Sequence, residues 1–151
     1  MIMNVFDKDF ANSIVTRINK LTPESKALWG GMNVAKMLAH CNVSYEMAYE
    51  KKHPKPNGFV RFMLKTFVKK AVVGNAPYRK KLRTAPAFEI KTDKDFEQEK
   101  SRLIDFINKT VQLGPSEFSG KESLSFGALT VEEWNNLFGK HLEHHLSQFG
   151  V

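Results

Sequence analysis

Two histidines, His141 and His145, lie four residues apart near the C-terminus of this 151-residue chain. The apolar residues of segment 131–149 recur at helical spacing, so both rings are expected on one face of a helix, about 6 Å apart between Cβ atoms. A His-x-x-x-His pair on a helix lets two imidazoles reach one metal ion. The pair alone leaves a second interpretation open, in which both are hydrogen-bonded core histidines.

A third histidine, His40, lies in segment 34–50, which has its own helical pattern. It falls beside the apolar stripe of that segment, so it can face the other two histidines if the two helices are neighbours. Three neutral imidazoles with open positions for water suit a catalytic Zn²⁺ ion, or Ni²⁺. No carboxylate joins the predicted cluster, which argues against a di-iron carboxylate site. Cys41 points about 100° away from its neighbour and is predicted to be a core residue.

The elements that must position these residues are predicted to be helices. Spacings of three and four predict four long helices and a shorter helix between the second and third of them. Proline and glycine separate them, and Asn33 and Thr130 are predicted N-caps, with Thr130 in a capping box with Glu133. The long helices are expected over 6–21, 34–50, 93–113 (after a cap at Thr92) and 131–149, and the short one over 59–73. The predicted fold is all-α: one domain, 1–151, forming an antiparallel four-helix bundle with an additional short helix.

The composition is that of an ordinary globular protein. Hydrophobic residues make up 42% of the chain and charged residues 26%. The N-terminal residues do not resemble a secretory signal, and the longest strongly apolar stretch, 71–73, is far too short to span a bilayer. A single cysteine excludes an internal disulfide and is typical of a reducing compartment. A cytoplasmic location is therefore expected.

Positive charge is concentrated in one segment. Residues 51–83 contain eleven of the 23 Lys and Arg and none of the 16 Asp and Glu. The segment is either a solvated face or a surface for an anion, such as phosphate, a carboxylate, nucleic acid or a membrane surface. Phe59, Phe62 and Phe67 are at helical spacing and are predicted to lie in the core, which leaves no base-stacking platform, so nucleic acid is not an expected partner. Association of residues 59–73 with a membrane surface remains an alternative.

Two stretches resemble the DinB-like superfamily of four-helix-bundle metalloenzymes. They are Trp29-Gly30-x-Met32-Asn33-x-x-x-Met37-x-x-His40 and Phe126-Gly127-x-Leu129-Thr130-x-x-Glu133-Trp134, which runs into His141-x-x-His144-His145-x-x-Gln148-Phe149. The chain is most similar to a branch of that superfamily known mainly as domains of unknown function. The basic insertion 51–83 departs from the simpler members.

The resemblance implies a metal site made of His40, His141 and His145. Some members of the superfamily are bacillithiol and mycothiol S-transferases, so the resemblance also implies thiol transfer with a low-molecular-weight thiol as co-substrate. Dimers are common in similar bundles, which makes a homodimer the expected assembly.

Two classes of function follow. The leading hypothesis is a metal-dependent enzyme whose ion activates a thiol or a water for attack on a small-molecule substrate, most like a thiol S-transferase, with hydrolysis as the second reaction. His144 or Gln148 is expected to orient a bound water or support a ligand histidine. Lys and Arg of 51–83 are candidates for holding a carboxylate or phosphate of the co-substrate. The alternative is a non-catalytic ligand-binding or stress-response module without an essential metal, because no general acid or base is evident beside the triad.

Overall fold

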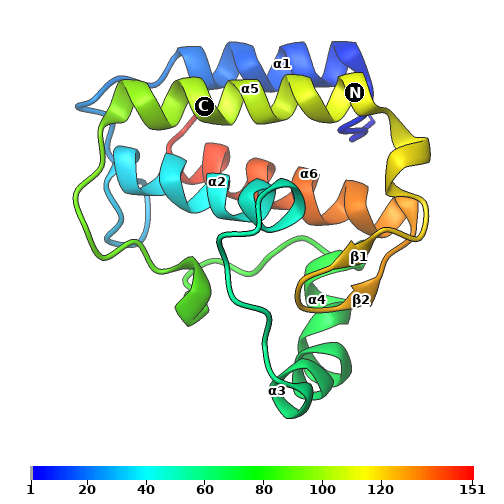
Figure 1. Ribbon diagram of the computed structural model, residues 1–151. Coiled ribbons are helices and arrows are strands. Elements are labelled where there is room, and N and C mark those ends of the chain that lie inside the picture. Colours follow the sequence, from blue (N-terminus) through cyan, green and yellow to red (C-terminus); the bar gives the residue numbers. More distant parts are fainter. Residues whose placement is uncertain (1) are drawn as a thin grey trace.

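The computed structural model describes residues 2–151 and is mostly helical (Figure 1). The long helices are α1 (Lys8–Asn19), α2 (Val34–Tyr49), α5 (Phe96–Leu113) and α6 (Val131–Gln148). The short elements are α3 (Gly58–Met63), a π-helical turn (Leu64–Val68), α4 (Lys69–Val73), 3-10 turns at Pro86–Phe88 and Pro115–Phe118, and strands β1 (Glu122–Ser123) and β2 (Gly127–Ala128). Among these residues, no helix is both long enough and apolar enough to cross a membrane.

The four long helices pack on one another around an aromatic core. α1 lies beside α5 in one layer and α2 lies beside α6 in the other, and α2 also packs against α5 (Figure 1). The ring of Tyr45 in α2 stacks on Phe138 of α6 at 4.4 Å and on Phe106 of α5 at 5.6 Å between centroids. Ile14 and Ile18 of α1 are completely buried against this core. Burial of these side chains holds α2 and α6 together.

The helix starts follow the predicted capping chemistry in two of three cases. Asn33 caps α2, and Thr130 with Glu133 forms the predicted capping box of α6. The prediction that Thr92 caps the third long helix was wrong: α5 begins at Phe96, and the Asp95 carboxylate accepts from the Gln98 backbone N–H. An aspartate adds a favourable charge at the helix N-terminus, which a threonine does not.

A two-stranded antiparallel hairpin, β1–β2, precedes α6, although strand signals are nearly absent from the sequence. The Ser123 hydroxyl donates to the Gly127 carbonyl and accepts from the Phe126 backbone N–H. Gly127 has a φ of 77°, in the left-handed region that favours glycine. The hydrogen bonds of Ser123 and the conformation of Gly127 therefore stabilise this hairpin. It forms without the alternating apolar pattern by which a strand is recognised in a sequence.

Residues 58–73, hereafter the arm, differ from their prediction. The predicted helix is present, with helical turns running without a break over 58–73, but its middle turn is π-helical. The placement of three phenylalanines in the core was wrong, since Phe59, Phe62 and Phe67 are 74%, 62% and 69% exposed. The arm packs on the core through its other side, and three apolar side chains make that contact: Leu64, Val72 and Val73. Helical spacing identifies an apolar face but does not say whether that face is covered.

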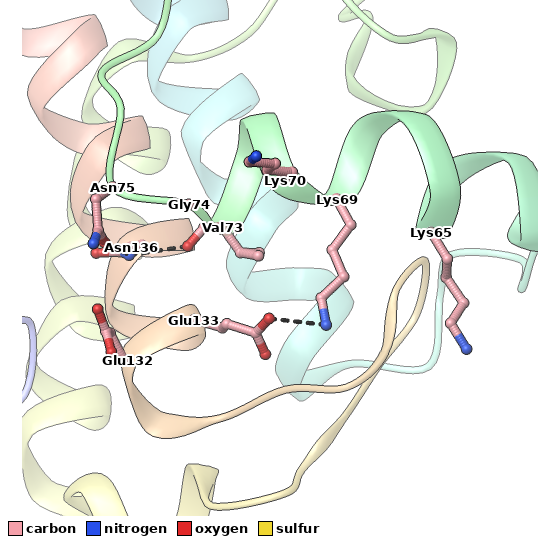
Figure 2. A pocket seen from close by; sticks show the side chains of 9 residues that line it. All are labelled: Lys65, Lys69, Lys70, Val73, Gly74, Asn75, Glu132, Glu133 and Asn136. Atoms are coloured by element: carbon pink, nitrogen blue, oxygen red, sulfur yellow. Dashed lines mark hydrogen bonds and ion pairs between the residues drawn. The ribbon is translucent and has the colours of Figure 1, made fainter.

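The C-terminal end of the arm is attached to α6 by polar side chains (Figure 2). Asn136 donates to the carbonyl of Val73 at 2.9 Å, and Lys69 forms an ion pair with Glu133 at 2.8 Å. The buried Lys140 ammonium, which is not in this view, donates to the carbonyls of Ala71 and Gly74 at 2.9 and 2.6 Å. These donors satisfy carbonyls that the end of α4 leaves free. The arm is therefore held by α6, the helix that carries His141 and His145.

A buried carboxylate joins α2 to α5. The Glu46 side chain is only 6% exposed and contacts Arg102 of α5 at 2.6 Å, Lys52 at 2.8 Å and His53 at 2.7 Å. Burial alone would raise the pKa of Glu46. Hydrogen bonds from Lys52, His53 and Arg102 outweigh the effect of burial and lower the pKa to about 2. His53 is mostly covered in this network, with 20% of its side chain exposed.

The low pKa of Glu46 makes the stability of the fold depend on pH. Its folded-state pKa lies below the unfolded value, so its contribution is present above about pH 4.5 and is lost as the pH falls towards 2. We expect Glu46→Gln to lower the free energy of unfolding at pH 7 by about 1–3 kcal/mol, because Arg102 loses its buried partner. Denaturant unfolding at several pH values measures this difference, which should shrink steadily below pH 4.5.

Glu117→Gln is the matched control, because Glu117 is half exposed in its pair with Lys121. That substitution should change the free energy of unfolding by less than about 0.5 kcal/mol at any pH. An equal effect of the two substitutions would contradict the role assigned to Glu46.

Candidate metal centre

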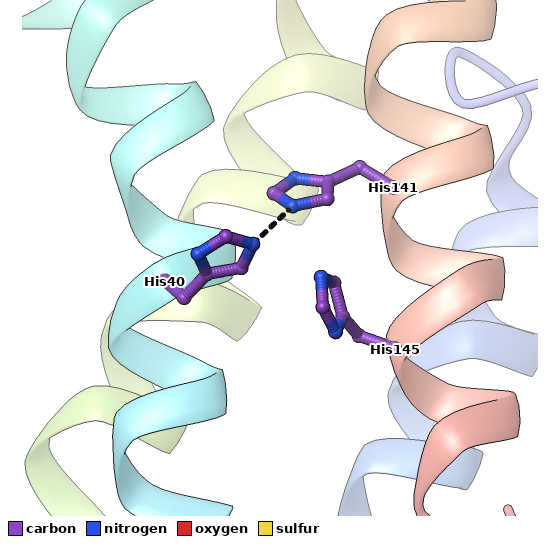
Figure 3. Close-up of side chains that lie close together, drawn as sticks. All are labelled: His40, His141 and His145. Carbon is purple, nitrogen blue, oxygen red and sulfur yellow. Dashed lines mark hydrogen bonds between the residues drawn. The ribbon is translucent and has the colours of Figure 1, made fainter. Parts of the chain in front are cut away.

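The structure brings His40, His141 and His145 together between α2 and α6 (Figure 3). One ring nitrogen from each residue lies within 4.8 Å of the others. His40 projects from α2, whereas His141 and His145 project from successive turns of α6 towards it. All three residues are buried, with exposed fractions of 6%, 8% and 7%. The i, i+4 spacing stacks the two α6 rings on the helix face that α2 covers.

Each of the three rings is held by its Nδ1 atom. The Nδ1 of His40 lies 2.9 Å from the carbonyl of Phe88, which can only accept. The Nδ1 of His145 lies 2.7 Å from Gln148 Oε1, and the amide nitrogen of Gln148 donates to the Trp29 carbonyl. Nδ1 must therefore carry the proton in both histidines, which leaves their Nε2 atoms with a lone pair.

His141 is held in the same way by a hydroxyl. Its Nδ1 lies 2.7 Å from Ser44 Oγ, and its Nε2 lies 2.8 Å from Nε2 of His40. Because the His40 Nε2 is an acceptor, His141 Nε2 must donate to it while the Ser44 hydroxyl donates to Nδ1. A hydroxyl can rotate and accept instead, which would move the proton of His141 to Nδ1 and leave three lone pairs facing one point. This is the donor set of a three-histidine metal site.

The surroundings keep these rings neutral. Burial is the main cause that lowers the pKa of His40, and it lowers that of His141 well below 6.5. Burial, with the neighbouring His40, lowers the pKa of His145 to about 3. An imidazole binds a metal ion through a nitrogen lone pair, which protonation would remove. The three rings are therefore neutral at neutral pH, as metal binding requires.

Aromatic side chains and one basic residue surround the cluster. The ring of Phe88 packs edge-on against His40 and His141, at 5.5 and 5.8 Å between centroids. His144 is partly buried between Trp29 and Tyr78, with its ring 4.9 Å from that of His145. Burial and the nearby charge of Lys80 lower the pKa of His144. His144 therefore lies between the three-histidine cluster and the partly exposed side chains of Trp29 and Tyr78.

The structure places the remaining predicted residues as follows. Gln148, expected near the site, hydrogen-bonds to His145, whereas His144 makes only ring contacts within residues 2–151. Cys41 is buried in the core beside Met37, and burial raises the pKa of its thiol, so it is not a reactive nucleophile. Of the basic segment 51–83, Lys80 lies near the cluster, with its ammonium 4.3 Å from the centre of the Trp29 ring.

Two contacts of the cluster were missed by the sequence analysis. Ser44 follows His40 by four residues, so the same i, i+4 rule that paired His141 with His145 could have found it. The Phe88 carbonyl had no such signal, because it belongs to an irregular connection whose path depends on the whole fold.

The profile of one protein family matches most of the chain. The profile of the family described as "Protein of unknown function (DUF1569)" matches residues 6–150, so the chain belongs to this family. The matched range includes all three histidines of the cluster. The predicted branch known as a domain of unknown function is thus confirmed at this level. No curated protein and no solved structure matches the chain.

The low pKa values predict that the metal-free protein loses stability in mild acid. The unfolded chain binds protons at these histidines below about pH 6.5, whereas the folded chain does not, so stability falls as the pH falls below 6.5. For each such histidine, the free energy of unfolding should fall by about 2 kcal/mol between pH 7 and pH 5.

We expect chelator-treated His145→Asn to lose less stability than the chelator-treated wild type between pH 7 and 5. Asparagine keeps an amide donor near the position of Nδ1, so the hydrogen bond to Gln148 can be retained. Denaturant unfolding at both pH values measures the difference between the two proteins. The same pH dependence in both would argue against a neutral His145.

Proposed function

We propose that this chain is a metal-dependent enzyme in which His40, His141 and His145 bind a divalent ion, Zn²⁺ or Ni²⁺, through their Nε2 atoms. The observation that carries the proposal is the convergence of three buried, neutral imidazoles whose Nδ1 atoms are all held by other groups. In residues 2–151 no hydrogen bond reaches Nε2 of His145, so its lone pair is available to a ligand. A metal ion would use that lone pair.

The proposed fold is the DinB-like four-helix bundle. Four long helices support it, with one histidine on the second and two, four residues apart, on the last. In that arrangement the first ligand position comes from α2 and the other two from α6. The single-domain organisation over 1–151, the homodimer and the cytoplasmic location are parts of the same proposal.

The proposed reaction is attack by an activated thiol or water on a small-molecule substrate. A Zn²⁺-type ion with three protein ligands keeps a position open and lowers the pKa of a water or thiol bound there. Thiol S-transfer is the reaction that the DinB-like resemblance favours. Gln148 would hold His145 in its metal-binding tautomer, and Lys80 lies near enough to attract an anionic group of a co-substrate. His144 would lie at the edge of the reacting groups.

The metal is tested first. Protein purified without a nickel column should contain one divalent ion per chain by elemental analysis. A chelator should lower its melting temperature, since an ion that binds only the folded state stabilises it by mass action. His145→Ala should weaken metal binding by more than about 100-fold, the upper value for losing a group that merely supports a ligand.

His144→Ala is the matched control, because His144 lies on the same turn of α6 but is not among the three converging residues. It should retain the ion. Substoichiometric metal in the wild type, or a melting temperature that does not respond to chelation, would favour the non-catalytic ligand-binding module instead.

Thiol activation has its own test in the Co²⁺-substituted protein. A low-molecular-weight thiol such as glutathione should change the visible spectrum and add a sulfur-to-cobalt charge-transfer band, because a thiolate would enter the open position. The S-methylated thiol is the control ligand and should leave the spectrum unchanged. A spectrum that responds to pH but not to the thiol would point to a metal-bound water and to hydrolysis.

A further inference from the structure

The arm carries an exposed apolar surface that has no covering element. Ten large hydrophobic side chains are exposed in residues 2–151, and six of them lie between residues 59 and 68. They are Phe59, Val60, Phe62, Met63, Phe67 and Val68. Figure 1 shows α3 projecting away from the layer that contains α2 and α6. A concentration of exposed apolar groups on one protruding element indicates a contact surface rather than ordinary surface composition.

Basic side chains stand beside these apolar ones. Lys65 follows Phe62 by three residues, and Lys70 follows Phe67 by three, so each lysine neighbours a phenylalanine on the helix surface. Within residues 2–151, neither lysine takes part in an ion pair, whereas Arg61 is paired with Glu122 and Lys69 with Glu133. The two paired cations face the body of the protein and help to hold the arm. The Lys65 side chain also lies on this side, over Gly127 of the hairpin, whereas Lys70 lies on the opposite side of the arm (Figure 2). Lys65 and Lys70 therefore carry uncompensated charge on two flanks of the apolar surface.

The distribution of charge indicates which partner fits. A two-fold contact between the arms of two copies would bring two basic surfaces together, because residues 51–83 contain no acid, and like charges would oppose that contact. Nucleic acid would satisfy the lysines and its bases could stack on the three phenylalanines, but Val60, Met63 and Val68, half of the six exposed apolar side chains, would stay in contact with water. A bilayer with anionic headgroups satisfies both features, since phosphates meet the lysines while the apolar side chains enter the acyl boundary.

We propose that the arm, residues 58–73, binds the surface of an anionic lipid bilayer. Phe59, Phe62 and Phe67 enter the headgroup region to a depth of about 5–10 Å, as in other interfacial helices. Lys65 and Lys70 contact lipid phosphates. The proposal is independent of the metal centre, because none of these residues lies in the histidine cluster.

Vesicle co-sedimentation with the full chain tests this surface. The protein should bind vesicles of phosphatidylcholine with phosphatidylglycerol and bind pure phosphatidylcholine vesicles weakly, and binding should fall as NaCl is raised to about 0.5 M because salt screens the charges. Phe59→Ser/Phe62→Ser/Phe67→Ser should weaken binding about tenfold or more, because each ring loses its apolar contact with the bilayer. Lys65→Glu/Lys70→Glu should also weaken it, by about 25-fold or more, at about fivefold for each lysine removed.

Matched controls are available on other surfaces of the chain. Leu113→Ser removes an exposed apolar side chain from α5, and Lys8→Glu/Lys94→Glu makes the same change of charge outside the arm. Both should bind vesicles like the wild type. All substituted side chains are exposed, so each variant should fold, and circular dichroism melts test this.

A fluorescent probe provides a second measurement. Phe62→Trp should show a blue-shifted emission and quenching by brominated lipids when anionic vesicles are added, whereas Leu113→Trp should show neither. Absence of vesicle binding, or equal binding by the arm variants and the wild type, would overturn the proposal. If light scattering shows a dimer of the wild type and a monomer of the triple phenylalanine variant, and neither protein binds vesicles, the proposal is overturned in favour of a second copy of the chain. Binding of single-stranded DNA without vesicle binding would overturn it in favour of nucleic acid.

Discussion

The burial of three neutral imidazole rings between α2 and α6 is the constraint on which the rest of the structure depends. A buried polar ring lowers stability unless its nitrogens find partners, and here the partners come from α2, α6 and the connection before α5. The Phe88 carbonyl, the Ser44 hydroxyl and the Gln148 amide each hold one Nδ1 atom, and Trp29 holds the amide in turn. Stacking of Tyr45 on Phe138 holds the two helices at the separation that these contacts require.

Much of this arrangement could be predicted from spacing. A helix that turns about 100° per residue puts His141 and His145 on one face, and the capping box at Thr130 sets where that helix starts. His40 required more, because whether α2 lies beside α6 depends on tertiary packing. The resemblance to a known superfamily supplied that helix order, and the structure brings the three rings together.

The failures of prediction have physical causes. Helical periodicity located an apolar face over 59–73, but the same pattern arises whether the face meets the core or the solvent, so the exposure of Phe59 and Phe67 could not be read from it. The path of residues 74–90 could not be predicted either. These residues adopt little regular structure, and Phe88 is positioned by its contacts with the histidine rings rather than by local preference.

Lys140 has a consequence for how the molecule opens. Its ammonium holds the carbonyls of Ala71 and Gly74, and burial lowers its pKa because so little water can reach it. Separation of α4 from α6 would break both hydrogen bonds and expose the buried Val73 side chain, so it raises the free energy. An isolated helix of five residues would fray within microseconds. Here the amide hydrogens of α4 should instead exchange with solvent only when the neighbouring turns of α6 open, so the two segments unfold as one cooperative unit.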